Sequence, residues 1–226
     1  MELQNIVPWG RTLAEYRAMF MLSDTELQGT ILGCGDGPAS FNSEVKALGG
    51  KVISIDPIYS FDKEQISNRI DEVADEVMAQ VRMKTDDFVW QNISSPDALY
   101  RIRMEAMHTF LDDYKLGKSQ GRYIHEALPT LSFKSKQFDV VLSSHFLLLY
   151  STHLDEAFHI EAILEMLRVS KEVRIFPIIT LEGKRSPHLD GIMARLKTLG
   201  YLTTIEKVAY EFQKGGDEML RVRRSK

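Results

Sequence analysis

The most constraining feature of this sequence is the stretch from Gly29 to Asp56, in which short apolar runs alternate with glycines. One apolar run ends in the glycine turn Gly33–Gly37, and a second run ends on Asp56. Between them, apolar residues at helical spacing predict a helix from Pro38 to Leu48. Strand, glycine turn, helix, strand and acid are the layout of a nucleotide-binding βαβ unit. In such a unit Asp56 is placed to accept hydrogen bonds from ribose hydroxyls.

The spacing of the glycines narrows the choice of nucleotide. A dinucleotide fingerprint, G-x-G-x-x-G, would need a glycine where Pro38 stands, whereas this chain has G-x-G-x-G. That turn, followed by VISIDP at 52–57, resembles the first two motifs of class I S-adenosylmethionine-dependent methyltransferases. The segment ALPTLSFKSKQFDVVLSSHFLLLY at 127–150 is similar to that superfamily's adenine-side loop and fourth strand. Residues 62–122 do not fit the resemblance.

The resemblance implies an α/β fold of Rossmann type, with a seven-stranded, mostly parallel sheet, a C-terminal antiparallel hairpin and helices on both faces. It implies S-adenosylmethionine as cofactor and methyl transfer as the reaction. The family usually has an acid two residues before the first glycine, near the methionine amino group, but here Ile31 stands there. Either other groups, such as backbone carbonyls, recognise the amine, or the site is altered. The cofactor-binding residues that we expect are Tyr16, Gly33, Cys34, Gly35, Asp36, Asp56, Pro57, Ile58, Ala127, Leu128, Ser144 and His145.

A helix is predicted before the first strand. Thr12 and Glu15 form a capping box, which starts the helix at Thr12. In the resembling family a tyrosine-bearing helix at this place often closes over the cofactor. Tyr16 is therefore a candidate contact, and Arg17 is a candidate for the cofactor carboxylate. The alternative is that Tyr16 packs in the core and Arg17 is solvated.

The segment 62–121, between the second and third predicted strands, is much longer than a crossover between parallel strands needs. It predicts a helical insertion within one domain over 1–226. A buried stripe predicts a long helix from Lys63 to about Met83. Ser95, followed by proline, starts a second helix that we expect Gly117 to close. Beside the strand tips the pair would form a cap that sets substrate choice and excludes water. The alternative is a surface for a homodimer. Trp90, between the helices, is expected to pack rather than face a substrate.

The remaining elements follow from apolar runs and turn residues. A basic, alternating stretch near the C-terminus is interpreted as an edge strand that pairs in a hairpin. The expected elements are a third strand over 121–125, a fourth over 138–145, a helix over 153–169, a fifth strand over 173–178, a last helix over 186–200, and a hairpin of 203–212 with 219–222 joined through 213–217.

Polar residues follow the fourth strand, at the edge of the sheet where open α/β sheets bind ligands. His145 is the candidate general base if the acceptor needs deprotonation, because histidine titrates near neutrality. The alternative is a histidine that bonds a backbone carbonyl. Tyr16 or Tyr150 could place an aromatic ring against the sulfonium. His159 and His188 are expected to be structural.

The composition of the chain limits the kinds of partner that we expect it to bind. A net charge of −4 gives no general attraction to nucleic acid or to anionic membranes, so we expect a small-molecule acceptor. With a single cysteine, Cys34, internal disulfides are ruled out and a cytoplasmic location is expected. We see no signal peptide and no apolar run approaching the ~20 residues of a membrane span. No metal is predicted.

Two other functions remain open at this level. A nicotinamide-dependent oxidoreductase would expect the third glycine that the chain lacks. A non-catalytic binding or regulatory protein that keeps the fold would be consistent with Ile31 in place of the usual acid. Nothing after the fourth strand resembles Asn/Asp-Pro-Pro-Tyr, the segment that would suggest attack on a nucleic-acid base or a glutamine amide.

Overall fold

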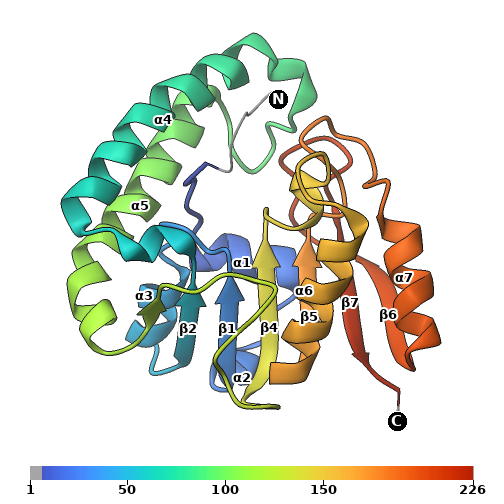
Figure 1. Cartoon of the computed structure of the whole chain (residues 1–226). Coiled ribbons are helices and arrows are strands. Elements are labelled where there is room, and N and C mark those ends of the chain that lie inside the picture. The colour runs from blue at the N-terminus through green and yellow to red at the C-terminus, as the bar shows by residue number, and fades with distance from the viewer. Residues whose placement is uncertain (1–6, 226) are drawn as a thin grey trace.

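The computed structural model describes residues 7–225 and is built on a seven-stranded sheet (Figure 1). The strand order is β3-β2-β1-β4-β5-β7-β6, and β7 runs in the direction opposite to the other strands, so it pairs antiparallel with both β5 and β6. This is the mostly parallel, Rossmann-like α/β sheet with a C-terminal antiparallel hairpin that the sequence predicts. The strands are β1 Thr30–Cys34, β2 Lys51–Ile55, β3 Tyr123–Ile124, β4 Phe138–Ser144, β5 Ser170–Phe176, β6 Tyr201–Lys207 and β7 Glu218–Arg224.

Helices cover both faces of the sheet because its central strands are apolar on both sides. In β1, Ile31 belongs to the core under α1 and α3, while the next residue, Leu32, belongs to the core under α6 and α7. This alternation fixes the two layers around the strands. The helices that form these layers are α1 Leu13–Phe20, α3 Phe41–Ala47, α6 Glu156–Val169 and α7 Leu189–Thr198, and a short α2 spans Asp24–Leu27.

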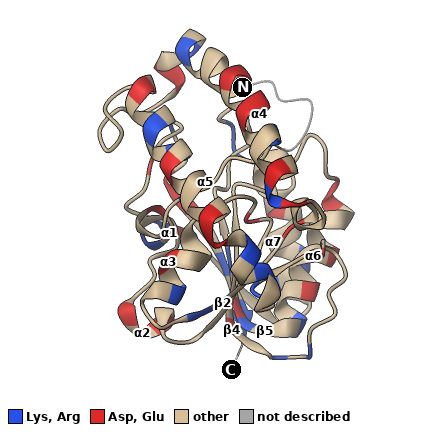
Figure 2. Cartoon of the chain, turned by 90° about the vertical axis from the view of Figure 1, so that its left-hand side faces the viewer, with Lys and Arg blue, Asp and Glu red and all other residues tan. Residues whose placement is uncertain are grey.

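Two long helices, α4 (Lys63–Met83) and α5 (Pro96–Ser119), follow β2 and precede β3 along the chain. They arch over the carboxyl ends of the strands (Figure 1). Their predicted starts are confirmed, since Asp62 and Ser95 cap them. Both helices carry charges of either sign (Figure 2). No helix within residues 7–225 is long and apolar enough to cross a membrane.

Two predicted helix boundaries in the part of the chain before β3 are wrong, each for a local reason. Pro38 stands in the turn before α3, which begins only at Phe41. Helix α5 runs past Gly117 and ends before Gly121, whose φ of +70° suits the left-handed position after a helix. A Cβ at Gly117 would lie 2.3 Å from the Tyr123 ring, so this glycine permits close packing rather than a stop.

Two later helices also start after their predicted positions. Helix α6 begins at Glu156 because the Asp155 side chain accepts from the backbone N–H of Phe158, so the cap is Asp155 rather than the Ser-Thr pair before it. Helix α7 begins at Leu189. In the turn before it, the Ser186 hydroxyl accepts from the backbone N–H of His188.

The C-terminal strands pair with each other as predicted, but the segment that connects them differs from the prediction. Strand β7 is not an edge strand: it lies between β5 and β6. Residues 208–217 do not extend β6, because Tyr210 and Phe212 turn inward and pack against the apolar cores instead of pairing in the sheet. The connection thereby reaches the carboxyl edge of the sheet.

Candidate active site

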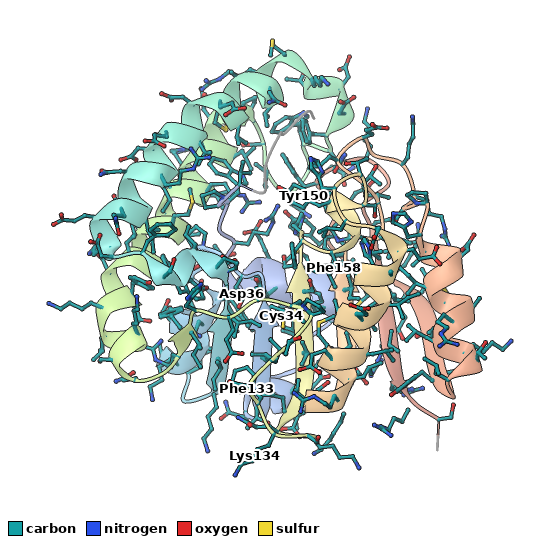
Figure 3. The ribbon with its side chains drawn as sticks, viewed as in Figure 1. Cys34, Asp36, Phe133, Lys134, Tyr150 and Phe158 are labelled. Atoms are coloured by element: carbon teal, nitrogen blue, oxygen red, sulfur yellow. The ribbon has the colours of Figure 1, made fainter. Side chains whose placement is uncertain are left out.

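A cavity of about 700 Å³ lies between the carboxyl ends of the strands and the two arching helices. Its floor includes the turn after β1, with Asp36, and its opposite wall includes Tyr150, which Figure 3 shows well above Asp36. The volume is within the usual range for small-molecule sites, about 300–1,000 Å³.

The cavity brings together all but two of the residues predicted to bind a cofactor. The exceptions are Gly33, which is covered by the Asp36 carboxylate, and Cys34, which is fully buried in the core under α6. The predicted residues that line the cavity are Tyr16, Gly35, Asp36, Asp56, Pro57, Ile58, Ala127, Leu128, Ser144 and His145.

Asp56, at the end of β2, is tied to the glycine turn. One carboxylate oxygen accepts from the N–H of Gly37 at 2.9 Å, and the other accepts from the N–H of Ile58 at 2.8 Å. Burial raises the pKa of Asp56, although these two bonds favour its charged form. Each oxygen keeps a further lone pair, so the side chain can accept from a ligand's hydroxyl groups.

A second carboxylate, that of Asp36, is held between α1 and β2. Its Oδ1 accepts from the Tyr16 hydroxyl at 2.8 Å and its Oδ2 from the Ser54 hydroxyl at 2.6 Å. The Tyr16 ring stacks on Phe41 with 4.1 Å between centroids, which fixes its position at the cavity wall. Burial raises the pKa of Asp36 to about 6, with Asp56 adding to the effect and the two hydroxyls opposing it.

The arginines at the site do not include the candidate Arg17, for which the solvated alternative holds. Arg17 pairs with Asp24 outside the cavity, because it lies on the outer side of α1. Arg11 and Arg103 line the cavity instead. Arg103 is almost fully buried and donates to Glu15 at 2.7 Å.

Sequence reasoning missed Arg103, although a signal was present. Leu99, Arg103 and Met107 follow one another at i+4 along the buried stripe of α5, so the arginine had to find a partner inside. Tyr210 completes the cluster: its hydroxyl donates to Glu15 at 3.1 Å and accepts from Arg103 at 3.3 Å. Burial would raise the pKa of Glu15, but the nearby arginines outweigh it and lower that pKa to about 2.

His145 lies at the cavity wall directly after β4. Its φ of +52° turns the chain away from the sheet, and its ring packs edge-on against Phe176 and Tyr210. Nδ1 lies 3.0 Å from the Ser144 hydroxyl. Burial, reinforced by Arg11, lowers the pKa of His145 well below its ordinary value, so the imidazole is neutral at neutral pH.

Several other aromatic and histidine residues near the site have structural roles. Tyr59, which follows Ile58 after β2, does not line the cavity; its hydroxyl donates to the carbonyl of Gly37 at 2.7 Å and its ring packs under α5. Trp90 packs on Phe212 outside the cavity, in agreement with a packing role. The rings of His159 and His188 lie against backbone carbonyls. Within residues 7–225 no three His, Cys, Asp or Glu side chains gather as a metal site.

The part of the cavity beneath the arching helices is apolar, and we call it the apolar chamber. Its walls come from α4, α5 and the segment between them, and also from the residues before α1, the loops after β4 and β5, and the 208–217 connection. Distant parts of the chain therefore converge there. The apolar chamber is lined by Trp9, Val77, Val81, Phe88, Leu99, Phe146, Leu149, Tyr150, Leu181 and Phe212.

The comparison with curated proteins finds one relative along nearly the whole chain. The uncharacterized protein MJ0045 of Methanocaldococcus jannaschii is 37% identical over 225 residues, which are 99% of this chain and 99% of that protein. No family model matches the chain.

Solved structures of methyltransferases are similar to this chain at low identity. Magnesium protoporphyrin IX methyltransferase from Synechocystis PCC 6803, with bound SAM, is 12% identical, with a TM-score of 0.49 over 93% of this chain and 77% of that one. Precorrin-6y C5,15-methyltransferase from Geobacter metallireducens GS-15 is 14% identical, with a TM-score of 0.43 over 94% of this chain and 85% of that one. A likeness this distant says nothing about the substrate of this chain.

Proposed function

We propose that this chain, which belongs to the family of the uncharacterized protein MJ0045 of Methanocaldococcus jannaschii, transfers a methyl group from S-adenosylmethionine to a small, largely apolar acceptor. The observation that carries the proposal is one continuous cavity. It joins the apolar chamber under α4 and α5 to the glycine turn and to Asp56, the carboxylate that is placed to accept hydrogen bonds from ribose hydroxyls.

The half of the cavity at the carboxyl ends of the strands, lined by the glycine turn, Asp56, Ile58 and Ala127, is called the strand-edge half, and it supports the choice of cofactor. Asp56 is held by the backbone of the glycine turn and can accept from both hydroxyls of a ribose. Ile58 and Ala127 line the neighbouring wall, where an adenine ring would find apolar contact and backbone groups. The missing third glycine at Pro38 argues against a dinucleotide pyrophosphate at the same turn.

The apolar chamber supports a small acceptor. Its walls surround the space beyond Tyr16 and His145 on several sides, so an acceptor there would be partly shielded from water. Most of the side chains that line it are apolar, although Arg69, His153 and Gln213 line the cavity from the same elements, and an apolar molecule would lose less hydration on entry than a charged polymer. A net charge of −4 also gives nucleic acid no general attraction.

When bound, S-adenosylmethionine supplies a methyl group on a sulfonium, which an acceptor atom displaces in line. The chain's contribution would be alignment and the exclusion of water. Tyr16 presents a ring fixed by stacking on Phe41, and Tyr150 presents a second ring from the chamber side. His145 stands at the chamber boundary as a neutral imidazole that can accept a hydrogen bond from an acceptor hydroxyl or amine; because its pKa is lowered, it is a weaker base than an ordinary histidine.

The test is calorimetric titration with S-adenosylhomocysteine. Asp56→Ala should weaken binding by about 1–3 kcal/mol, because ribose hydroxyls would lose their acceptor. Glu64→Ala, which removes an exposed carboxylate at the start of α4, is the matched control and should leave the dissociation constant unchanged. Equal binding by the Asp56→Ala variant would remove Asp56 from the site, and no binding by the unmodified protein would overturn the proposed function.

A further inference from the structure

The Asp36 carboxylate occupies a place that a strand residue would normally fill. It folds back over the end of β1, so closely that a Cβ added to Gly33 would lie 1.8 Å from Asp36 Oδ2. Because side chains alternate along a strand, Gly33 and Ile31 point to the same face of the sheet. The carboxylate therefore lies on the face toward which the Ile31 side chain points, two residues further along, at the cavity.

Among the residues that the structure describes, Asp36 has no cationic partner. The residue is 7% exposed, and the titratable groups that face its carboxylate are Tyr16, Cys34, Asp56 and Tyr59, none of which is a cation. Within residues 7–225, no lysine, arginine or histidine forms an ion pair with it. A buried carboxylate without a counter-charge is costly, so a cation brought by a ligand would be bound favourably there.

We propose that Asp36 provides the counter-charge for the α-ammonium group of the cofactor, in place of the acid that is missing at Ile31. The inference rests on the proposed function and deepens it. Ile31 is fully buried in the core under α1 and cannot reach a ligand. Tyr16 and Ser54 hold both carboxylate oxygens in place, and the remaining lone pairs of this cavity-lining group can accept from an ammonium.

A pair of ligands separates this role from a general effect on the site. S-adenosylhomocysteine carries the ammonium, whereas 5′-methylthioadenosine keeps the adenosine and the thioether without it. Asp36→Asn should weaken S-adenosylhomocysteine binding at least tenfold at pH 7.5 and change methylthioadenosine binding less than threefold. Asp56→Ala should weaken both ligands, because both carry the ribose. Circular dichroism and the methylthioadenosine titration together verify that the Asp36→Asn variant is folded.

A second measurement needs no variant. Burial raises the pKa of Asp36 to about 6, so an ammonium bound beside it should expel about half a proton from the unmodified protein at pH 6. Calorimetry of S-adenosylhomocysteine in two buffers of different ionisation enthalpy measures that release, and methylthioadenosine should give none.

The outcomes distinguish the two proposals. If the unmodified protein binds neither ligand, the proposed function fails and this inference with it. If S-adenosylhomocysteine binds but Asp36→Asn weakens both ligands equally, or weakens neither, Asp36 is a structural residue and the inference is overturned. Proton release with S-adenosylhomocysteine alone, together with selective weakening, supports it.

Discussion

The two halves of the cavity are built in different ways. In the strand-edge half, polar groups are held by contacts between neighbouring elements, such as Asp56 with the N–H of Gly37. In the apolar chamber, the walls converge from distant parts of the chain, and Leu99 and Phe212 meet there without any shared motif. A motif in sequence thus encodes the first half, whereas only the tertiary packing of the whole chain makes the second.

One buried cluster joins the halves. Arg103 comes from α5 of the chamber side, Glu15 from α1 of the sheet side, and Tyr210 from the 208–217 connection. Because these residues tie the arch to the sheet, changing them tests whether the two halves depend on one another.

The largest effect is expected from Arg103→Ala. It leaves the Glu15 carboxylate buried without its main partner, which should lower the free energy of unfolding by about 3–5 kcal/mol. Urea denaturation followed by circular dichroism measures the loss. Arg82→Ala removes an exposed arginine that pairs with Asp97 and serves as the control, with an expected cost of about 0–1 kcal/mol. Similar losses for the two variants would mean that the cluster does not hold the arch to the sheet.

A smaller effect, on the strand-edge half alone, is expected from pH. Because burial raises the pKa of Asp36 from 3.8 to about 6, the folded ligand-free protein binds more protons than the unfolded chain between these values. As the pH rises through that window, ionisation of Asp36 therefore lowers the free energy of unfolding, by at most about 3 kcal/mol.

Asp36→Asn removes that titration. Relative to the unmodified protein, the variant should gain stability progressively from pH 4 to pH 7, even though it binds the cofactor less well. Thermal unfolding of both proteins at several pH values gives the difference, in which the other carboxylates cancel. A difference that stays constant across this range would show that Asp36 titrates normally.

The smallest effect is expected from Ser95→Ala, on the arch alone. The Ser95 side chain accepts from the N–H of Ala98 at the start of α5, and its loss should cost about 1 kcal/mol of stability. S-adenosylhomocysteine affinity should not change, because the cap lies outside the cavity. Thermal unfolding and calorimetry on the same preparation check both statements, and a loss of affinity would mean that the two halves are more tightly coupled than we argue.

The sequence predicts most of the fold because its signals are local. The bounds of α4 are reproduced as predicted, since an uninterrupted apolar stripe and the Asp62 cap act within one helix. The order of the central strands follows from the βαβ layout in the same way. The homodimer predicted through residues 62–121 stays a prediction.

What the sequence did not predict depends on contacts between distant elements. The alternation of Val208, Tyr210 and Phe212 is typical of a strand, yet Tyr210 and Phe212 pack into the cores because aromatic surface is better buried there than in the sheet edge. Arg17 was a candidate for the site and Arg103 was not considered, because which arginine reaches the cavity depends on how α1 and α5 pack together.

The most direct test of the central claim, that one cavity holds a polar cofactor half and an apolar acceptor half, is a crystal structure with S-adenosylhomocysteine. We expect the ribose hydroxyls within hydrogen-bonding distance of Asp56 and the sulfur directed past Tyr16 toward the apolar chamber. Density for the adenosine inside the apolar chamber, or no ligand at the strand edge at saturating concentration, would contradict the account.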